Sequence, residues 1–398
     1  MQYRVNVRNG DRLSALGFGF MRLPRTGGRD NKIDREESIR LARLAYELGI
    51  NYYDTAYIYN NGESEKILGE AVKPFRDKIK IANKLPLYYV RQASDIDKFF
   101  NISIKRMDTA YFDYYLMHSV IDYNQWRKMK SLGIIDWIKE KKEKKQIINI
   151  GFSFHGRYED FIKILEDYSW DFVQIQYNFI DINYQAGTTG LKRAHELKIP
   201  VFIMEPLRGG MITDRQPKDA VEMWRKAQPN RSLADWGLRW VWNHEEVTML
   251  LSGMSSEKML RENAQISENA LPNSLSEREL DYYRKAREEL LKIHAIPCTG
   301  CKYCMPCPKG VDIPTCFTVY NNKHTLKARK NRIKYISDLA VLSDKPGYAS
   351  LCIKCGKCEP HCPQGIKIRE ELVRVKKDLE FPFYKTFIKI AKRIVYKK

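Results

Sequence analysis

All nine cysteines of this 398-residue chain lie beyond Pro297, so nearly three quarters of the sequence contains none. Eight of them form two closely spaced runs. The first run is Cys298, Cys301, Cys304 and Cys307, and the second is Cys352, Cys355, Cys358 and Cys362. A chain of this length accommodates two domains. We therefore expect a cysteine-free body followed by a small domain that the cysteines organise.

The spacing of the cysteines indicates iron–sulfur clusters. In the second run two residues separate the first three cysteines, three precede the fourth, and Pro363 follows it. Bacterial two-cluster ferredoxins have this spacing, and their fourth cysteine reaches across to the other cluster. The first run has two residues before Cys307 where three are usual. Eight thiolates could instead bind two zinc ions, but the Cys-Pro endings favour two 4Fe–4S clusters. Cys316 lies outside both runs and is expected to be a buried thiol.

The N-terminus and the hydropathy pattern predict a cytoplasmic protein. The first residues, Met1 to Val7, do not resemble a signal peptide. No segment approaches the roughly 20 apolar residues that span a bilayer. In the cytoplasm, cysteines are more often metal ligands than disulfides.

Positive charge is concentrated at the C-terminal end. Residues 298–398 hold 22 Lys and Arg against 8 Asp and Glu, which is most of the net charge of +20. Part of this excess could offset the anionic clusters. The rest could attract an acidic electron-transfer protein such as ferredoxin or flavodoxin. Nucleic acid is not expected as a partner, because the chain has the charge but no nucleic-acid-binding motif.

Short apolar runs alternate with amphipathic stretches throughout the body. Eight strands are predicted at Leu16–Gly19, Ile50–Asp54, Ile79–Asn83, Tyr114–Met117, Ile148–Ser153, Phe172–Gln176, Pro200–Met204 and Thr248–Ser252. Helices are predicted at Asp34–Leu48, Ser64–Val72, Ser94–Lys105, Trp126–Lys142, Arg157–Glu166, Thr189–Leu197, Ser256–Gln265 and Ser276–Ile293. This α/β alternation predicts a (β/α)₈ TIM barrel. A hairpin over residues 2–16, with Asn9-Gly10 as its turn, would cap the bottom of the barrel.

The predicted domains are the barrel at 1–292, a small α-helical ferredoxin-like domain at 293–380, and a basic tail at 381–398. The tail places Phe383, Phe387, Ile390 and Ile394 on one helical stripe among lysines. The simplest interpretation is a solvated helix packed on the body. Contact with a membrane surface is the alternative.

Ionisable residues follow three successive predicted strands of the barrel. Asp54 ends the second strand, Lys84 follows the third and His118 follows the fourth, with Tyr59 in the loop after Asp54. Catalytic groups of such barrels lie at these strand ends. His118 could be a core histidine, and Asp54 and Lys84 a structural ion pair. The grouping of all four favours an active site.

These four groups suit reduction of a carbonyl by hydride. Hydride addition leaves charge on the carbonyl oxygen, which a proton donor must neutralise. The phenol of Tyr59 has an ordinary pKa near 10. A neighbouring Lys84 ammonium is expected to lower it. Asp54 would hold Lys84, and His118 would orient the carbonyl oxygen.

The segment from Asp54-Thr-Ala-Tyr-Ile-Tyr59 to Leu68-Gly69 resembles the signature of the aldo-keto reductase family. The resemblance runs from about Leu16 to Asn263, and the whole chain is similar to the branch with a C-terminal two-cluster ferredoxin-like domain. It implies that Asp54, Tyr59, Lys84 and His118 form the catalytic tetrad. It also implies an oxidoreductase that uses NADPH or NADH on a small carbonyl substrate.

The same resemblance implies a cofactor site. Its residues would be Ser153 and Gln174 at the carboxamide, Met204 at the nicotinamide ring, and Ser252, Gly253, Glu262 and Asn263 at the adenosine end. Lys258, with Arg261, could receive the 2′-phosphate of NADPH. Phe154 and Asn83 depart from the residues common in the family, an asparagine and a threonine.

Three functions remain open from the sequence, because nicotinamide moves two electrons and each cluster moves one. The first is a carbonyl reductase whose clusters are structural or dock an electron partner. The second is a ferredoxin-linked electron-transfer enzyme for which nicotinamide is not the sole donor. The third is a redox-sensing binding protein built on a reductase barrel.

Overall fold

The computed structural model describes residues 1–27, 32–214, 216, 218–228, 230–292, 295–298, 300, 302–324, 331–343, 345–362 and 364–396. Residue contacts divide the chain into two compact units. The first comprises Met1–Asn178, Ala186–Gly209 and Ser232–Leu275, and the second comprises Phe179–Gln185, Gly210–Arg231 and Ser276–Lys398. This division follows packing rather than sequence order, and the domain boundaries predicted at 293 and 381 stay predictions.

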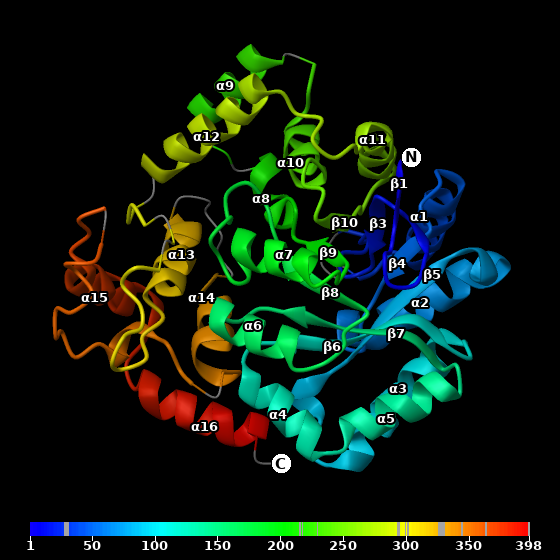
Figure 1. Cartoon of the computed structure of the whole chain (residues 1–398), viewed down its shortest axis with the longest axis horizontal. Helices are drawn as coiled ribbons and strands as arrows, with labels where there is room; N and C mark the ends of the chain where they lie inside the picture. The colour runs from blue at the N-terminus through cyan, green and yellow to red at the C-terminus, as the bar shows by residue number, and fades with distance from the viewer. Residues whose placement is uncertain are drawn as a thin grey trace. The chain divides into compact units, whose positions relative to one another are not determined.

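Eight parallel strands of the first unit close into a barrel in the order β10, β3, β4, β5, β6, β7, β8, β9 (Figure 1). They are β3 (Leu16–Gly19), β4 (Tyr52–Asp54), β5 (Lys80–Leu85), β6 (Phe112–Val120), β7 (Ile147–Phe154), β8 (Phe172–Gln176), β9 (Val201–Met204) and β10 (Val247–Ser252). Each predicted strand corresponds to one of these, and no strand end differs by more than three residues. The predicted (β/α)₈ fold is therefore confirmed.

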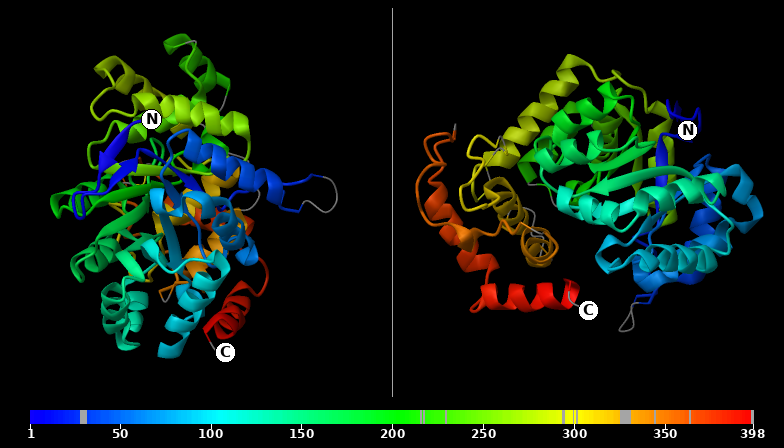
Figure 2. Two further views of the ribbon diagram at one scale, coloured as in Figure 1. Left: turned by 90° about the vertical axis from the view of Figure 1, so that its right-hand side faces the viewer. Right: turned by 60° about the horizontal axis from the view of Figure 1, so that its bottom comes forward.

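Helices of the first unit surround its barrel on the outside (Figure 2). Those of the first unit are α1 (Arg35–Glu47), α2 (Glu63–Val72), α3 (Ala93–Met107), α4 (Tyr123–Ser131), α5 (Ile134–Glu143), α6 (Tyr158–Glu166), α7 (Gly187–Glu196), α10 (Leu233–Trp242) and α11 (Glu257–Ile266). The side chain of Asp34 caps α1 by accepting the Glu37 N–H at 3.0 Å. The single helix predicted over Trp126–Lys142 is wrong. Gly133 takes a φ of 80° there and separates α4 from α5.

Aromatic side chains fill the barrel below the strand ends. Tyr52, Tyr114, Phe172 and Phe202 are all at most 1% exposed. The ring centroids of neighbouring pairs lie between 4.9 Å (Phe172 to Phe202) and 5.6 Å (Tyr114 to Phe202) apart. The interior is thus a packed core rather than a channel, and only the carboxyl ends of the strands remain for chemistry.

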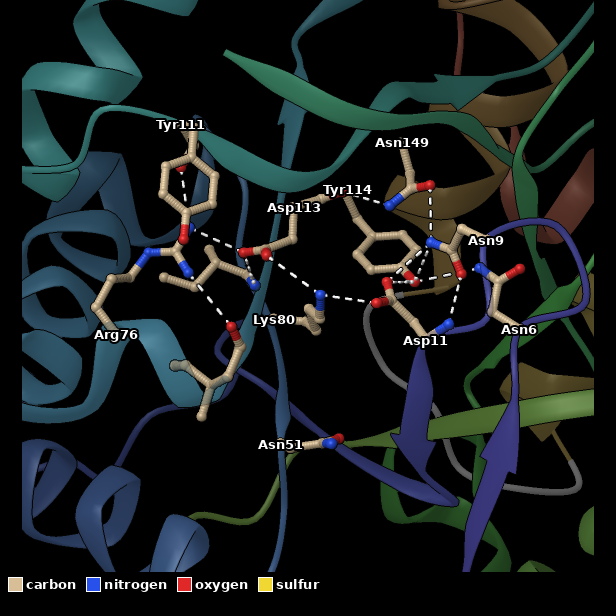
Figure 3. A network of polar contacts seen from close by, with 12 residues as sticks. Asn6, Asn9, Asp11, Asn51, Arg76, Lys80, Tyr111, Asp113, Tyr114 and Asn149 are labelled. Carbon is tan, nitrogen blue, oxygen red and sulfur yellow. Dashed lines mark hydrogen bonds and ion pairs between the residues drawn. The ribbon is translucent and has the colours of Figure 1, made fainter. Parts of the chain in front are cut away.

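The predicted hairpin is formed by β1 (Tyr3–Val5) and β2 (Arg12–Ser14), which pair antiparallel. Figure 3 shows its turn against the first residues of the barrel strands. The Tyr114 hydroxyl donates to Asp11 at 2.7 Å, and Lys80 at the start of β5 pairs with Asp11 at 2.7 Å. Asn6 donates to the same hydroxyl at 3.1 Å. The hairpin therefore caps the amino-terminal end of the barrel, as predicted.

The second unit is helical. Its helices are α8 (Met211–Asp214), α9 (Lys218–Ala227), α12 (Glu277–Lys292), α13 (Ile313–His324), α14 (Asn331–Ile336), α15 (Ile368–Leu379) and α16 (Tyr384–Tyr396), with a π-helical turn at Ser337–Val341. Short 3₁₀ helices lie in both units at Tyr59–Gly62, Lys73–Lys78, Leu87–Tyr89, Arg208–Gly210, Ser267–Asn269 and Ala349–Leu351. Ser276 and Glu279 form the predicted capping box at the start of α12, with reciprocal hydrogen bonds of 2.9 and 3.3 Å. Among the described residues, no helix is long and apolar enough to cross a membrane.

Candidate functional site

Three ionisable side chains lie at neighbouring strand ends of the barrel. Asp54 is the last residue of β4, Lys84 is next to last in β5, and His118 lies near the end of β6. Strand β5 pairs with β4 and β6 on either side, with Ala82 opposite Asp54 and Lys84 opposite Leu116. Since parallel strands end at the same rim, the three side chains reach the same mouth.

The ammonium of Lys84 is at the centre of the group. Its Nζ lies 2.5 Å from Asp54 Oδ1 and donates to the carbonyl of Thr55 at 2.7 Å. The same Nζ lies 4.8 Å from the ring centroid of Tyr59, whose ring is 5.7 Å from that of His118 in a T-shaped arrangement. The structure thus brings together all four residues of the predicted tetrad.

Burial sets the protonation of the tyrosine and the histidine. It raises the pKa of Tyr59 well above its ordinary value, and the carboxylates of Asp54 and Glu205 act in the same direction. The predicted net lowering of the Tyr59 pKa is therefore wrong, because the loss of hydration outweighs the attraction of any neighbouring positive charge. Burial also lowers the pKa of His118 well below its ordinary value, helped by the Lys84 ammonium and His155. At neutral pH the phenol keeps its proton and the imidazole is uncharged.

The ion pair itself is nearly dry, with side-chain exposures of 1% for Lys84 and 5% for Asp54. Burial raises the pKa of Asp54, and Lys84 together with the Gln174 side chain opposes this. Burial lowers the pKa of Lys84, and Asp54 opposes it. The two charges therefore depend on each other, and replacing either one leaves the other unfavourable.

A second buried pair lies behind the tetrad, and sequence reasoning missed it. The carboxylate of Glu65 is 0% exposed and accepts from Arg106 at 2.7 Å and from Asn83 at 2.8 Å. Asn83 precedes Lys84 and accepts its backbone N–H at 2.7 Å, and Arg106 donates to the carbonyl of Tyr57 at 3.0 Å. Glu65 therefore fixes both the strand end that carries Lys84 and the loop that leads to Tyr59. In the sequence, Asn83 was a signal of this pair, because the family commonly has a threonine there. Nothing in the sequence near Arg106 indicated that it pairs with Glu65.

The residues predicted to hold a nicotinamide fit that group. Ser153 on β7 pairs in register with Gln174 on β8, and its Oγ accepts the backbone N–H of Ser119 at 2.8 Å. Gln174 is 3% exposed, and its Oε1 has no hydrogen-bond partner among the described residues. A buried amide oxygen without a partner is costly, and a ligand that donates to it would remove that cost. Met204 ends β9 and is partly exposed.

The predicted adenosine-end residues gather around α11. Asn263 donates to the hydroxyl of Ser252 at 3.1 Å, and both are buried. Gly253 follows directly, Lys258 is exposed and Glu262 is half-buried. Arg261 pairs with Glu257 at 2.7 Å, and Glu257 also binds Arg40 at 2.6 Å. The guanidinium proposed for a 2′-phosphate is therefore already neutralised by a carboxylate.

The cysteines of the second unit surround two cavities. A cavity of about 490 Å³ is lined by Cys352, Cys355 and Cys358 of the second run together with Cys304 and Cys307 of the first. The pKa of Cys358 is raised by burial, and Cys352 and Cys307 contribute, so these thiols are neighbours. The fourth cysteine of the first run thus lies with the second run, despite its shorter spacing.

A smaller cavity of about 20 Å³ is lined by Cys298, Cys304 and Cys362. The fourth cysteine of the second run thus lies with the first, which is the exchanged arrangement predicted from the spacing. Cys301 lies outside the described residues. Among the residues that are described, no three His, Cys, Asp or Glu side chains could hold a single metal ion. Cys316 is fully buried, as predicted, and its Sγ lies 3.4 Å from the Gly347 carbonyl.

The sequence matches two known families. The aldo/keto reductase family profile matches residues 15–278, and the profile of a 4Fe–4S dicluster domain matches residues 297–366. The uncharacterized oxidoreductase YqkF of Bacillus subtilis is 24% identical over 71% of this chain and 95% of its own length. The NADH-specific methylglyoxal reductase of Escherichia coli is 22% identical over 70% of this chain and 96% of its own. The second match includes both cysteine runs and confirms iron–sulfur clusters rather than zinc.

Solved structures show the same barrel. The holo form of aldo-keto reductase AKR11C1 from Bacillus halodurans superposes with a TM-score of 0.61 at 24% identity, covering 72% of this chain and 96% of that one. An aldo-keto reductase from Klebsiella pneumoniae in complex with NADPH gives 0.57 at 19% identity, covering 72% and 95%. At these identities the likeness supports the fold.

Proposed function

This oxidoreductase belongs to the aldo/keto reductase family and carries a 4Fe–4S dicluster domain, and from that premise we propose that it reduces a carbonyl compound with NADPH or NADH. One observation carries the proposal. A protonated phenol, a neutral imidazole and a buried ammonium–carboxylate pair converge at one barrel mouth, with Lys84 Nζ 4.8 Å from the Tyr59 ring. Each of these groups has a place in the chemistry of carbonyl reduction.

The phenol of Tyr59 supplies the proton. Bound nicotinamide would supply a hydride to the carbonyl carbon, which places negative charge on the carbonyl oxygen. That oxygen takes the hydroxyl proton of Tyr59, because an alkoxide is a stronger base than a phenolate. The C=O π bond becomes a C–H and an O–H bond, and the product is an alcohol. Lys84 stabilises the phenolate that remains, since its charge lies beside the ring.

The neutral imidazole of His118 can donate a hydrogen bond to the same carbonyl oxygen. A protonated imidazole would compete with Tyr59 as the acid, and the lowered pKa of His118 prevents this. Asp54 holds the Lys84 ammonium in place at 2.5 Å. Ser153 and Gln174 would hold the carboxamide of the cofactor, Met204 would face its ring, and Ser252 and Asn263 would meet its adenosine end.

Replacing the phenol tests the assignment. We expect Tyr59→Phe to lower kcat for carbonyl reduction by about 10²-fold or more, the contribution typical of a general acid, while nucleotide binding is retained. Tyr57→Phe is the matched control, because it also removes a tyrosine hydroxyl, only two residues before Tyr59. The ring of Tyr57 packs on the guanidinium of Arg106 at 4.4 Å. Unchanged turnover in Tyr59→Phe, measured by NADPH oxidation over a panel of aldehydes and ketones, contradicts the proposed proton donor.

We also propose that electrons enter or leave the dicluster domain at the second run of cysteines. Cys355 is exposed there, and so are Tyr303 at 68% and Ile353 at 57%. Lys354 and Lys357 are exposed beside them. An apolar centre with a basic rim over a cluster ligand suits a small acidic electron carrier. This supports the ferredoxin-linked alternative to nicotinamide as sole donor.

Reduced ferredoxin, offered without nicotinamide, tests this route. We expect slow turnover that the double variant Lys354→Glu/Lys357→Glu weakens through a higher KM for ferredoxin. A viologen needs no docking face, so its rate stays unchanged. Lys376→Glu/Lys377→Glu makes the same charge change at exposed positions of α15 and serves as control. No turnover with reduced ferredoxin contradicts the route but leaves carbonyl reduction by NADPH untouched.

A further inference from the structure

Helix α16 presents apolar side chains on two faces. Tyr384 and Ile388 are 4% and 3% exposed and belong to the hydrophobic core of the second unit. A second row faces solvent: Phe387 is 42% exposed, Ile390 52% and Ile394 61%, and Phe383, which directly precedes the helix, is 85% exposed. The predicted apolar stripe is therefore not the face by which this helix packs. We call these four side chains the α16 ridge.

The charged side chains of α16 all have one sign. Lys385, Lys389 and Arg393 are exposed and follow each other at four-residue steps, which places them in a row along the helix. The sequence from 381 to 398 contains six Lys and Arg residues and neither Asp nor Glu. A helix that only packs on its own domain would not need all its charged side chains to have the same sign.

A further cation borders the ridge. The guanidinium of Arg332 lies over the ring of Phe381 at 5.5 Å, and that ring meets Phe387 at 5.1 Å. The aromatic surface thus continues beyond α16 to α14 and ends there at a positive charge. A basic group on α14 thus adds to those on α16, and the surface suits a negatively charged partner that tolerates large apolar side chains.

We propose that the α16 ridge is a docking surface for an anionic lipid bilayer. Large apolar side chains on one face, with lysines and arginines on the polar face, are typical of helices that lie in the plane of the membrane interface. From Phe387 to Ile394 the helical part of the ridge is about 10 Å long at 1.5 Å per residue, and it is one side chain wide. A stable protein interface buries about 800 Å² on each partner, more than such a row offers. A bilayer requires no shape complementarity, and its phosphate headgroups match the basic row.

Vesicle co-sedimentation of the full, cluster-loaded chain tests the proposal. We expect at least tenfold stronger partition to vesicles of phosphatidylcholine and phosphatidylglycerol in equal parts than to phosphatidylcholine alone. Added salt weakens this binding. The double variant Phe387→Ser/Ile394→Ser loses at least tenfold, and so does Lys389→Glu/Arg393→Glu. Because these side chains are exposed, both variants keep their iron content and carbonyl reduction.

The control variant is Val373→Ser/Leu271→Ser, which removes two apolar side chains of similar exposure, 45% and 50%, that do not belong to the ridge. It should bind vesicles like the unaltered chain. Vesicle binding that survives in Phe387→Ser/Ile394→Ser overturns the proposal. So does a lipid-independent dimer that this variant abolishes, because the ridge would then cover a second copy of the chain. Failure to bind any vesicle also overturns it, whatever the reductase activity.

Discussion

Replacing Arg106 with methionine should destabilise the barrel far more than breaking an ordinary surface ion pair. Arg106 lies 2.7 Å from Glu65, whose side chain is 0% exposed, while that of Arg106 is 23% exposed. Methionine keeps an unbranched side chain but removes the guanidinium that lies over the Tyr57 ring at 4.4 Å, and it leaves a buried carboxylate without its cation. Breaking a buried pair in this way costs about 3–5 kcal/mol. Partial hydration of the arginine position puts our expectation at about 3 kcal/mol.

A double-mutant cycle separates the pair from its surroundings. Glu65→Gln keeps an acceptor for Asn83, so we expect a smaller cost of about 1–2 kcal/mol. The double variant has no buried charge left without a partner. Its cost should therefore fall short of the sum by about 2 kcal/mol, within the range seen for residues in contact. The exposed pair of Arg35 and Glu70, 45% and 52% exposed, provides the control, and Arg35→Met should cost below about 1 kcal/mol.

Urea unfolding followed by tryptophan fluorescence measures these costs, because six of the seven tryptophans lie in the first unit. Glu65 also holds Asn83 and, through Arg106, the loop before Tyr59, so kcat of Arg106→Met should fall although the residue touches no substrate. The reasoning is refuted if Arg106→Met costs no more than Arg35→Met. Costs that add within about 0.5 kcal/mol in the cycle refute it as well.

Three further predictions concern protons, clusters and the cofactor. Because the pKa of His118 is lowered, the unfolded chain binds a proton below about pH 6.5 that the native chain does not; unfolding free energy should therefore fall as pH drops below that value, and His118→Gln should flatten the slope between pH ~6.5 and ~5. The purified chain should hold about eight iron atoms, and Cys307→Ala and Cys362→Ala should each lose about four, from different clusters with distinct electron paramagnetic resonance signals. Glu257→Gln releases Arg261, so KM for NADPH should fall several-fold while KM for NADH stays constant.

The sequence determines the barrel because each strand is a short apolar run with its own boundaries. The strand ends then determine the tetrad, since Asp54, Lys84 and His118 follow consecutive strands and the barrel must bring them to one rim. The break at Gly133 was missed because a glycine within an amphipathic pattern costs only about 1 kcal/mol and does not by itself end a helix. The roles given to the site residues stay predictions until the variants are measured.

The features that the sequence did not predict depend on contacts between residues that are far apart in the chain. Glu65 and Arg106 are 41 positions apart, and no local pattern pairs them. The same limit explains the pKa of Tyr59. A lysine near a tyrosine is visible in the sequence, but the loss of water around the phenol depends on how α2, β5 and β6 pack around it. The ridge on α16 is a third case, because the sequence shows its stripe but not which face the core takes up.

The side chains at the barrel mouth suit proton transfer, whereas the clusters transfer single electrons, and this difference constrains how the two parts can cooperate. The groups at the barrel mouth are a phenol, an imidazole, an ammonium and a carboxylate, and all of them manage protons and charge rather than single electrons. Each 4Fe–4S cluster transfers one electron, whereas a hydride carries two. Two clusters together carry as many electrons as one hydride. However, none of the four tetrad side chains can split the two electrons of a hydride into single electrons. If NADPH alone bleaches the cluster absorbance under anaerobic conditions, a further electron carrier must be bound. If it does not, the clusters and the barrel act on separate electron supplies, and the proposed role of Tyr59 as proton donor does not depend on the clusters.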